Sequence, residues 1–151
     1  SLKDYQKEKI LKNITVRWNP RYYNTPYDER IAIERYKLAL ITAMVSEDKK
    51  SSIGMILLRI SWMYRCLKEA DELIYLKEAL AALEEAYNLE DFPIYNLDEL
   101  NFKYLLGELN RRAGNDKEAI KYLGDVITSS KANSRLKNLA RDQRDKIKNK
   151  Y

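Results

Sequence analysis

Any chemistry in this chain must come from carboxylates, arginines, tyrosines and one cysteine, because its 151 residues include no histidine. The absence of histidine removes the commonest general base, the commonest metal ligand and every Ser-His or Cys-His nucleophile pair. The single cysteine, Cys66, has no partner for an intrachain disulfide and cannot form a multi-cysteine zinc site. Carboxylates are plentiful, but none of them is singled out by an apolar setting. We therefore expect no enzyme activity, no cofactor and no metal site.

Composition also excludes other common functional motifs. With 4 Gly and 3 Pro, the chain has no phosphate-binding loop and no dinucleotide fingerprint. The densest apolar run covers residues 38–45, far short of the roughly 18 to 20 residues that a membrane span needs. No charged-then-apolar secretory signal opens the chain. We therefore expect a cytoplasmic protein without a membrane span.

The dominant sequence period is helical. Apolar residues recur at spacings of three and four, and no stretch shows the alternation of a strand. These patterns predict an all-α fold. The predicted helices cover residues 2–14, 26–46, 52–69, 72–88, 97–113, 116–129 and 134–148.

Helix boundaries are predicted from capping residues. Thr25, Asn96 and Asn115 each precede an acidic residue by three positions, which is the arrangement of a capping box. Residues 66–71 contain no Gly or Pro, and only Asp71 offers a cap there. An uninterrupted helix through this segment would be unusually long for a globular domain, so we predict a break.

Three helices carry a small–bulky–small triad with the same internal offsets of four and three residues. The intervals between successive triads are 47 and 40 residues, and each suits one helical hairpin. A small residue lets the second helix of a hairpin approach the first, and the bulky residue fills the groove beside it. The alternative is that alanine and leucine are simply good helix formers. The triads are Ala32, Tyr36 and Ala39, then Ala79, Leu83 and Ala86, then Ala119, Leu123 and Val126.

The third triad belongs to a longer pattern. Leu106 and Gly107, followed by Gly114 and then the triad, resemble the tetratricopeptide repeat (TPR). The resemblance implies a right-handed superhelix of about three helical hairpins with a C-terminal capping helix. We predict one such domain over residues 1–151. It would comprise a first helix at 1–14, an aromatic and basic linker at 15–25, hairpins over 26–130 and a basic capping helix at 131–151.

A second resemblance covers nearly the whole chain. Four segments carry it, YKLAL at 36–40, WMYR at 62–65, GELNRRAGN at 107–115 and LARDQ at 139–143. In these segments the chain is similar to an uncharacterised bacterial family, domain of unknown function 2225. Members of that family typically carry a cysteine-rich, zinc-ribbon-like region ahead of a TPR-like region, and the cysteines of that region are not in this chain, so the resemblance implies no metal site here.

The TPR resemblance implies a concave face on which the first helices of successive hairpins hold a peptide. Mixed aromatic, guanidinium and amide groups are common in peptide recognition, and arginines can hold a carboxylate bidentately. We therefore expect a non-catalytic scaffold whose ligand is a protein or peptide with an acidic group or C-terminal carboxylate. The oligomeric state is left open. The groove positions carried over are Leu58, Trp62, Arg65, Asn101, Tyr104, Glu108, Arg111 and Arg112.

Each of these positions also has a plainer interpretation. Trp62 can belong to the core between hairpins, and Glu108 can form a local ion pair with Arg111 or Arg112. Asn110 beside them can satisfy a turn. Cys66, in a helical stretch, is expected to be a small buried residue. If the hairpins stack, Arg65, Arg111 and Arg112 would approach one another.

The two chain ends are basic, although the net charge is only +5. Residues 15–24 interleave aromatic and basic side chains, as do surfaces that bind single-stranded nucleic acid, although these aromatics can instead cover the first hairpin. Residues 131–150 have a narrow apolar stripe, and their other faces are basic. This segment suits a capping helix, with a membrane-surface or nucleic-acid role as the alternative. An accessory domain that binds nucleic acid through both ends is therefore the second functional hypothesis.

Overall fold

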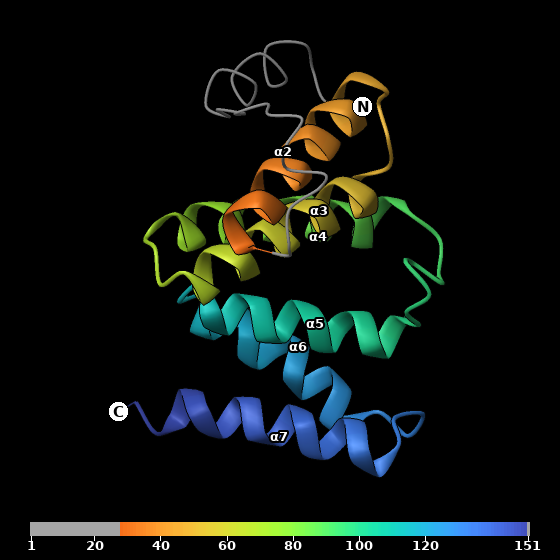
Figure 1. Cartoon of the computed structure of the whole chain (residues 1–151). Coiled ribbons are helices and arrows are strands. Elements are labelled where there is room, and N and C mark those ends of the chain that lie inside the picture. Colours follow the sequence, from red (N-terminus) through yellow and green to blue (C-terminus); the bar gives the residue numbers. More distant parts are fainter. Residues whose placement is uncertain (1–27, 151) are drawn as a thin grey trace. The chain divides into compact units, whose positions relative to one another are not determined.

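The computed structural model describes residues 28–150, and this part of the chain contains six helices and no strand (Figure 1). The prediction of an all-α fold is thus confirmed. The predicted helix at 2–14 and the linker at 15–25 lie outside the described residues. The predicted break between the third and fourth predicted helices is present. The helices are α2 (Glu29–Val45), α3 (Lys50–Cys66), α4 (Asp71–Leu89), α5 (Glu99–Arg112), α6 (Asp116–Thr128) and α7 (Ser134–Lys148).

None of the predicted capping boxes is confirmed, and Thr25 itself lies outside the described residues. The Asp28 carboxylate caps α2 and accepts from the backbone N–H of Arg30, so the helix begins three residues later than predicted from Thr25. Asp98, not Asn96, caps α5, because Asn96 has a positive φ of 61° and belongs to the preceding turn. Asn115 does precede α6 as predicted. It makes no side-chain cap hydrogen bond.

Three of the helix ends share one backbone arrangement. The residue just past each of these helix ends has positive φ, and the next N–H donates to a carbonyl five residues back, as in a Schellman motif. Only Gly114 matches the glycine that this position favours, so the turns at Glu47 and Lys68 gave no glycine signal in the sequence. The bonds are Asp48 N–H to Ala43 O at 2.9 Å, Glu69 N–H to Tyr64 O at 3.0 Å, and Asn115 N–H to Asn110 O at 2.8 Å.

The connection from α4 to α5 is the longest among the described helices. It contains a cis Phe92–Pro93 peptide and an isolated β-bridge between Ile94 and Leu97. Tyr95 and Asn96, the two residues inside the bridge, both have positive φ, which is the geometry of a type I′ turn. The bridge has backbone bonds of 3.0 and 2.9 Å in its two directions.

The chain divides into two compact units, the first ending at Ala82 and the second beginning at Leu83, within α4. In the first unit, α2 packs against α3. Lys37 from α2 is only 7% exposed, and its Nζ lies 5.6 and 5.9 Å from the ring centroids of Tyr64 and Tyr75. These two rings stack at 5.4 Å. One cation–π cluster therefore joins α2, α3 and the start of α4.

The first triad is not buried as predicted. Ala39 is exposed and Tyr36 is half-buried. The reason is the register of α2, whose buried side runs through Ile33, Lys37 and Leu40 and places Ala39 beyond its edge. The second and third triads are buried in full, and each of their six residues is 0% exposed.

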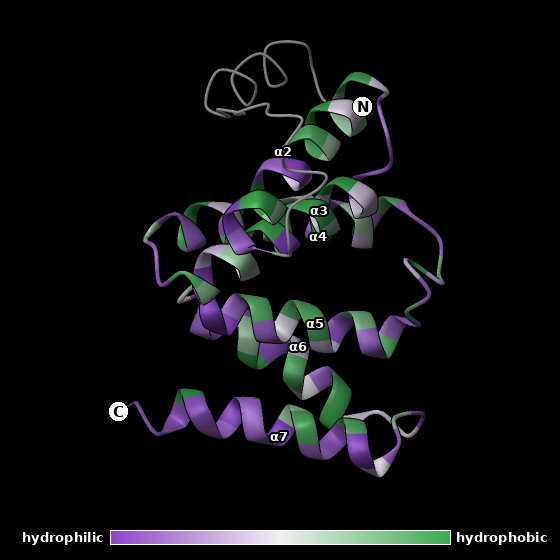
Figure 2. Cartoon of the chain, viewed as in Figure 1, coloured by the Kyte–Doolittle hydropathy of each residue, from purple (hydrophilic) through white to green (hydrophobic). Residues whose placement is uncertain are grey.

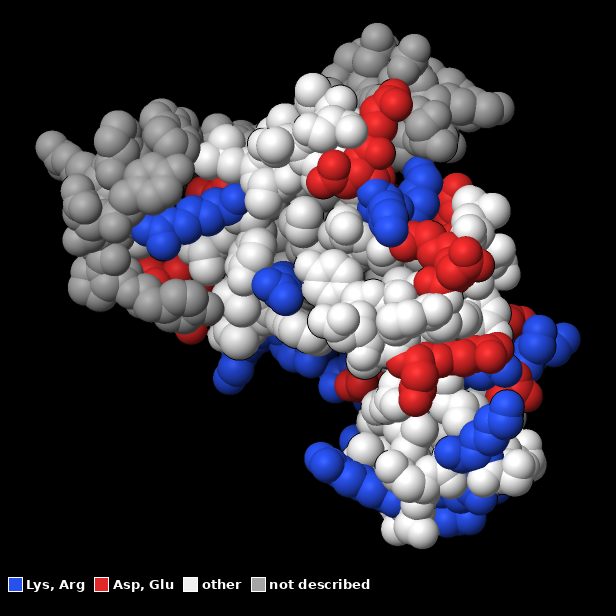
Figure 3. Space-filling model, turned by 90° about the vertical axis from the view of Figure 1, so that its right-hand side faces the viewer, with Lys and Arg blue, Asp and Glu red and all other residues white. Residues whose placement is uncertain are grey.

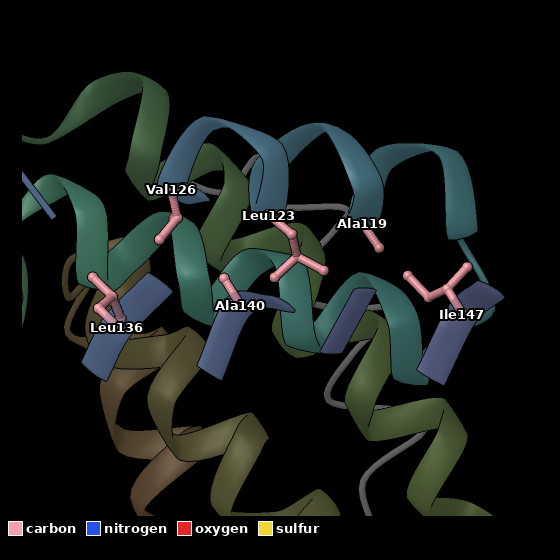
Figure 4. Close-up of a cluster of buried hydrophobic side chains, with 6 residues drawn as sticks. All are labelled: Ala119, Leu123, Val126, Leu136, Ala140 and Ile147. Atoms are coloured by element: carbon pink, nitrogen blue, oxygen red, sulfur yellow. The ribbon is translucent and has the colours of Figure 1, made fainter. Parts of the chain in front are cut away.

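In the second unit, α6 turns back along α5, and α7 turns back along α6 (Figure 1). Figure 4 shows the side chains of α6 and α7 pointing toward one another in one buried cluster. Figure 2 shows that α7 is mainly hydrophilic with separate hydrophobic positions, as expected for a helix with one buried side. The cluster consists of Ala119, Leu123, Val126, Leu136, Ala140 and Ile147.

The crossing of α5 over α6 depends on a glycine. A Cβ placed on Gly107 would lie 2.7 Å from Leu123 Cδ2 and 2.8 Å from Leu123 Cγ. Both distances are well inside van der Waals contact, so a side chain at position 107 would force Leu123 to shift. A Cβ on Gly124, the next residue of α6, would have no packing neighbour within 4 Å. Gly107 is thus a packing requirement, whereas Gly124 is not.

Candidate peptide-binding residues

The three predicted groove positions of α3 have different surroundings. Leu58 is 0% exposed, so its prediction as a ligand-contacting residue is wrong. It sits on the buried side of α3, where the spacing that placed it on the groove also fits a core position. Trp62, one turn later, is 38% exposed and is among the exposed large apolar residues of the chain. The side chain of Trp62 is therefore available to a ligand.

Arg65 is held by an acidic residue of the next helix. Its Nε donates to Glu72 Oε1 at 2.7 Å, and both side chains are about one-third exposed. Its Nη2 is buried without a hydrogen-bond partner among the described residues. The pair fixes the guanidinium against α4 and partly neutralises its charge. Arg65 is thus oriented, but a ligand carboxylate would have to compete with Glu72.

Asn101 has a capping role at the start of α5. Its backbone N–H and its Nδ2 both donate to Asp98 Oδ1, each at 2.8 Å. These bonds lower the pKa of the Asp98 carboxyl, because they stabilise its charged form. Asn101 is exposed on the surface of α5. Its amide is therefore directed by the helix cap.

Tyr104 and Arg111 contact α7 through a single residue. Gln143 is 7% exposed, and its Oε1 accepts from Arg111 Nε at 2.6 Å while its Nε2 donates to the Tyr104 hydroxyl at 3.4 Å. Burial raises the pKa of the Tyr104 phenol. The TPR resemblance implied a common face for these two residues of α5. It could not identify Gln143, which lies thirty-two positions after Arg111.

Glu108 and Arg112 form the local pair that was the plainer interpretation of this region. Arg112 Nε and Nη2 lie 3.1 and 3.0 Å from Glu108 Oε1, one helical turn apart on α5. Such a pair contributes about 0.3 to 0.5 kcal/mol to helix stability. Both side chains are roughly a quarter exposed. Because the two opposite charges offset each other, the surface beside Tyr104 and Arg111 has almost no net charge.

Asn110 is a structural residue that was only noted in the sequence. It is 1% exposed, and its Nδ2 donates to Leu106 O at 2.8 Å and to Glu84 Oε1 at 3.2 Å. Its Oδ1 accepts from Asn115 Nδ2 at 3.1 Å. Asn110 therefore satisfies the turn between α5 and α6 and also joins α5 to the end of α4.

A tyrosine-rich surface on α4 and α6 was not predicted. The rings of Tyr87 and Tyr122 meet edge to face at 6.2 Å, and the Tyr87 hydroxyl donates to Glu99 Oε1 at 3.3 Å. Burial raises the pKa of Tyr122 to about 12, and the nearby carboxylates of Glu84 and Glu118 add to this rise. Tyr87 and Tyr122 thus pack together within the second unit, and their ultraviolet absorbance can report on its folding.

The predicted approach of Arg65 to Arg111 and Arg112 stays a prediction. Arg65 belongs to the first unit, and the other two arginines belong to the second. Cys66 is exposed, so its prediction as a buried residue is wrong. It occupies the last position of α3, just before the turn at Lys68, where the helix surface meets solvent.

Membrane-spanning helices and metal sites are two further features that the described residues could form. Over residues 28–150, no helix is long and apolar enough to cross a membrane. Within the same range, no group of three or more acidic or cysteine side chains is arranged to hold a metal ion. The aromatic and basic segment at 15–24 lies outside the described residues.

Comparison with known proteins identifies a family. Residues 1–147 match the family model described as an uncharacterised protein conserved in bacteria, domain of unknown function 2225. Because the match covers nearly the whole chain, the chain belongs to this family. No curated protein and no solved structure matches it.

Proposed function

We propose that this member of the bacterial family is a non-catalytic scaffold that binds a peptide segment of a partner protein. The binding surface would be the groove side of TPR-like hairpins that continue as a right-handed superhelix. The ligand would carry an acidic group or a C-terminal carboxylate, and the protein would act in the cytoplasm.

The close crossing of α5 over α6 is the observation that carries this proposal. Gly107 lies against Leu123 within a triad that is 0% exposed throughout. A glycine on the first helix and a small–bulky–small triad on the second are the features of the TPR pattern. The contact thus supports a TPR-like hairpin.

The position of α7 supports the same interpretation. It contacts both α5 and α6, with Gln143 on α5 and Leu136, Ala140 and Ile147 on α6. In a repeat array each unit packs on its neighbour, so the first helix of a further unit would occupy such a position. Under this proposal α5 and α7 are adjacent helices of the groove.

The ligand class follows from the side chains of α5 and α3. The Nε of Arg111 donates to the amide oxygen of Gln143, which orients the guanidinium on α5. Trp62 is 38% exposed and offers an aromatic surface of the kind that anchors peptides. Within α5, Arg111 and Tyr104 both contact Gln143, and a guanidinium beside an aromatic ring favours a peptide with a carboxylate beside an apolar side chain.

The experiment is a selection from a displayed library of random peptides with free C-termini, using the whole chain as bait. Affinities of the selected peptides are then measured by fluorescence anisotropy for Trp62→Ala and Arg111→Ala. Ile74→Ala, which is 60% exposed on α4, and Lys117→Ala, which is exposed on α6, are the matched controls. We expect each groove variant to weaken binding about tenfold, as hot-spot residues do.

Two results would contradict the proposal. One is the absence of any enriched peptide sequence. The other is an equal loss of affinity in the groove variants and in their controls, because the peptide would then bind elsewhere. Far-UV circular dichroism checks that all four variants remain helical.

A further inference from the structure

A stripe of four basic residues runs along one side of α7. Lys137, Arg141, Arg144 and Lys148 follow one another at intervals of four, three and four residues, which places them within about 60° of the helix circumference. The buried side of α7 is formed by other residues, Leu136 and Gln143 among them. We propose that this basic stripe binds the phosphate backbone of a nucleic acid, as a second surface beside the peptide groove.

The charges of the basic stripe are not neutralised within the described part of the chain. None of its four residues forms an ion pair there, and Arg141 Nη1 donates only to the neutral Asn138 Oδ1, at 3.0 Å. Asp142 and Asp145, the acidic residues of α7, form no ion pair with it either. On the face drawn in Figure 3, Lys and Arg side chains gather where α7 lies, at the bottom of the picture.

The dimensions of the basic stripe suit a repeating anion. Eleven residues separate its first and last members, which corresponds to about 16 Å along the helix axis. A nucleic-acid strand in a duplex presents one phosphate about every 3.4 Å of its axis, so more than one of the four cations can contact phosphates at the same time. The Nε of Arg144 is buried without a hydrogen-bond partner among the described residues. Its charge is therefore less screened by water and gains more from a phosphate.

The surroundings of the basic stripe favour a nucleic acid over other polyanions. The apolar side of α7 is buried against α6, so it is not available to enter a membrane (Figure 4). Leu139, which is 39% exposed, lies on the opposite flank of α7. A protein partner would need an apolar anchor next to the charges, whereas phosphate binding depends mainly on charge alone.

The test compares two double variants of the full chain. Arg141→Gln/Lys148→Gln removes two exposed cations from the basic stripe, and Arg135→Gln/Lys146→Gln removes two exposed cations from the opposite flank. Both variants change the net charge of the same helix equally, and glutamine has a helix propensity close to that of lysine and arginine. Binding of a labelled single-stranded oligonucleotide, and of its duplex, is followed by fluorescence anisotropy over a range of salt concentrations.

For the single strand, we expect the stripe variant to flatten the log–log salt dependence of binding by about 1.4, the contribution of two phosphate contacts at about 0.7 each. The opposite-flank variant should keep the wild-type slope. No oligonucleotide binding at low salt, or an equal change in both variants, would overturn the proposal. Tighter binding to anionic lipid vesicles, or displacement of the oligonucleotide by poly(glutamate) at equal charge concentration, would assign the surface to a membrane or to an acidic protein instead. The form that binds more tightly, the single-stranded oligonucleotide or its duplex, identifies which kind of nucleic acid supplies the phosphates.

Discussion

Replacing Gly107 with alanine would drive a methyl group into Leu123. The new Cβ would lie 2.7 Å from Cδ2 and 2.8 Å from Cγ, and Leu123 is 0% exposed, so its side chain would have to shift within the core. Overpacking of this kind costs about 1 to 3 kcal/mol. Alanine in a helix returns about 0.5 to 1 kcal/mol relative to glycine. The net prediction is a loss of about 0 to 2.5 kcal/mol in the free energy of unfolding.

Two further variants isolate the contact. Gly124→Ala has the same helix-propensity gain with no neighbour within 4 Å, so it should stabilise the protein by about 0.5 to 1 kcal/mol. Leu123→Ala should cost about 2 to 5 kcal/mol, and it removes the atoms that clash with a residue at 107. In that background, Gly107→Ala should become neutral or stabilising.

The assay is urea denaturation followed by far-UV circular dichroism, with wild type, Gly107→Ala, Leu123→Ala and the double variant arranged as a double-mutant cycle. A coupling energy of about 1 to 3 kcal/mol between positions 107 and 123 is expected. The reasoning would be refuted if Gly107→Ala stabilised the protein as Gly124→Ala does, or if its cost were the same with and without the Leu123 side chain.

Three other predictions concern a turn, a cap and a phenol. Lys68→Gly should raise the free energy of unfolding by about 1 kcal/mol, because Lys68 has a φ of 55° that a side chain disfavours; thermal melting would show a higher Tm. Asp98→Ala should cost about 1 kcal/mol in chemical denaturation, whereas Asn96→Gly should cost nothing; the reverse ranking would restore Asn96 as the cap. In an ultraviolet titration, Tyr122→Phe should remove the phenolate step at about pH 12, and an unchanged titration curve would contradict the assignment. Because the pKa of Tyr122 is raised in the folded protein, the free energy of unfolding linked to this group should fall as the pH rises from about 10 toward 12.

The positions of the helices could be predicted from the sequence, but their buried sides and their end residues could be predicted only in part. Helical periodicity located all six described helices, because a buried side recurs every three to four residues. On α2, Ala39 of the first triad is exposed and its neighbour Leu40 is buried, because both positions fit a helical period. The turns at Glu47 and Lys68 carry no glycine, and their backbone bonds are not visible in the sequence.

The candidate groove shows the same division. The TPR resemblance assigned Tyr104 and Arg111 to one side of α5, and both contact the same residue of α7. It could not predict that Gln143 would hold both of them, because a contact between distant residues depends on how the helices pack. Nor could it separate Leu58, which is buried, from Trp62, which is exposed one turn later.

The most direct test of the peptide-binding scaffold is a two-dimensional NMR titration of the whole chain with a selected peptide. The account predicts that the amide signals of α5, together with the indole signal of Trp62, shift progressively and saturate as peptide is added. Shifts confined to the outer surface of α6, where Ile120 is 42% exposed, or no shifts at saturating peptide, would contradict it.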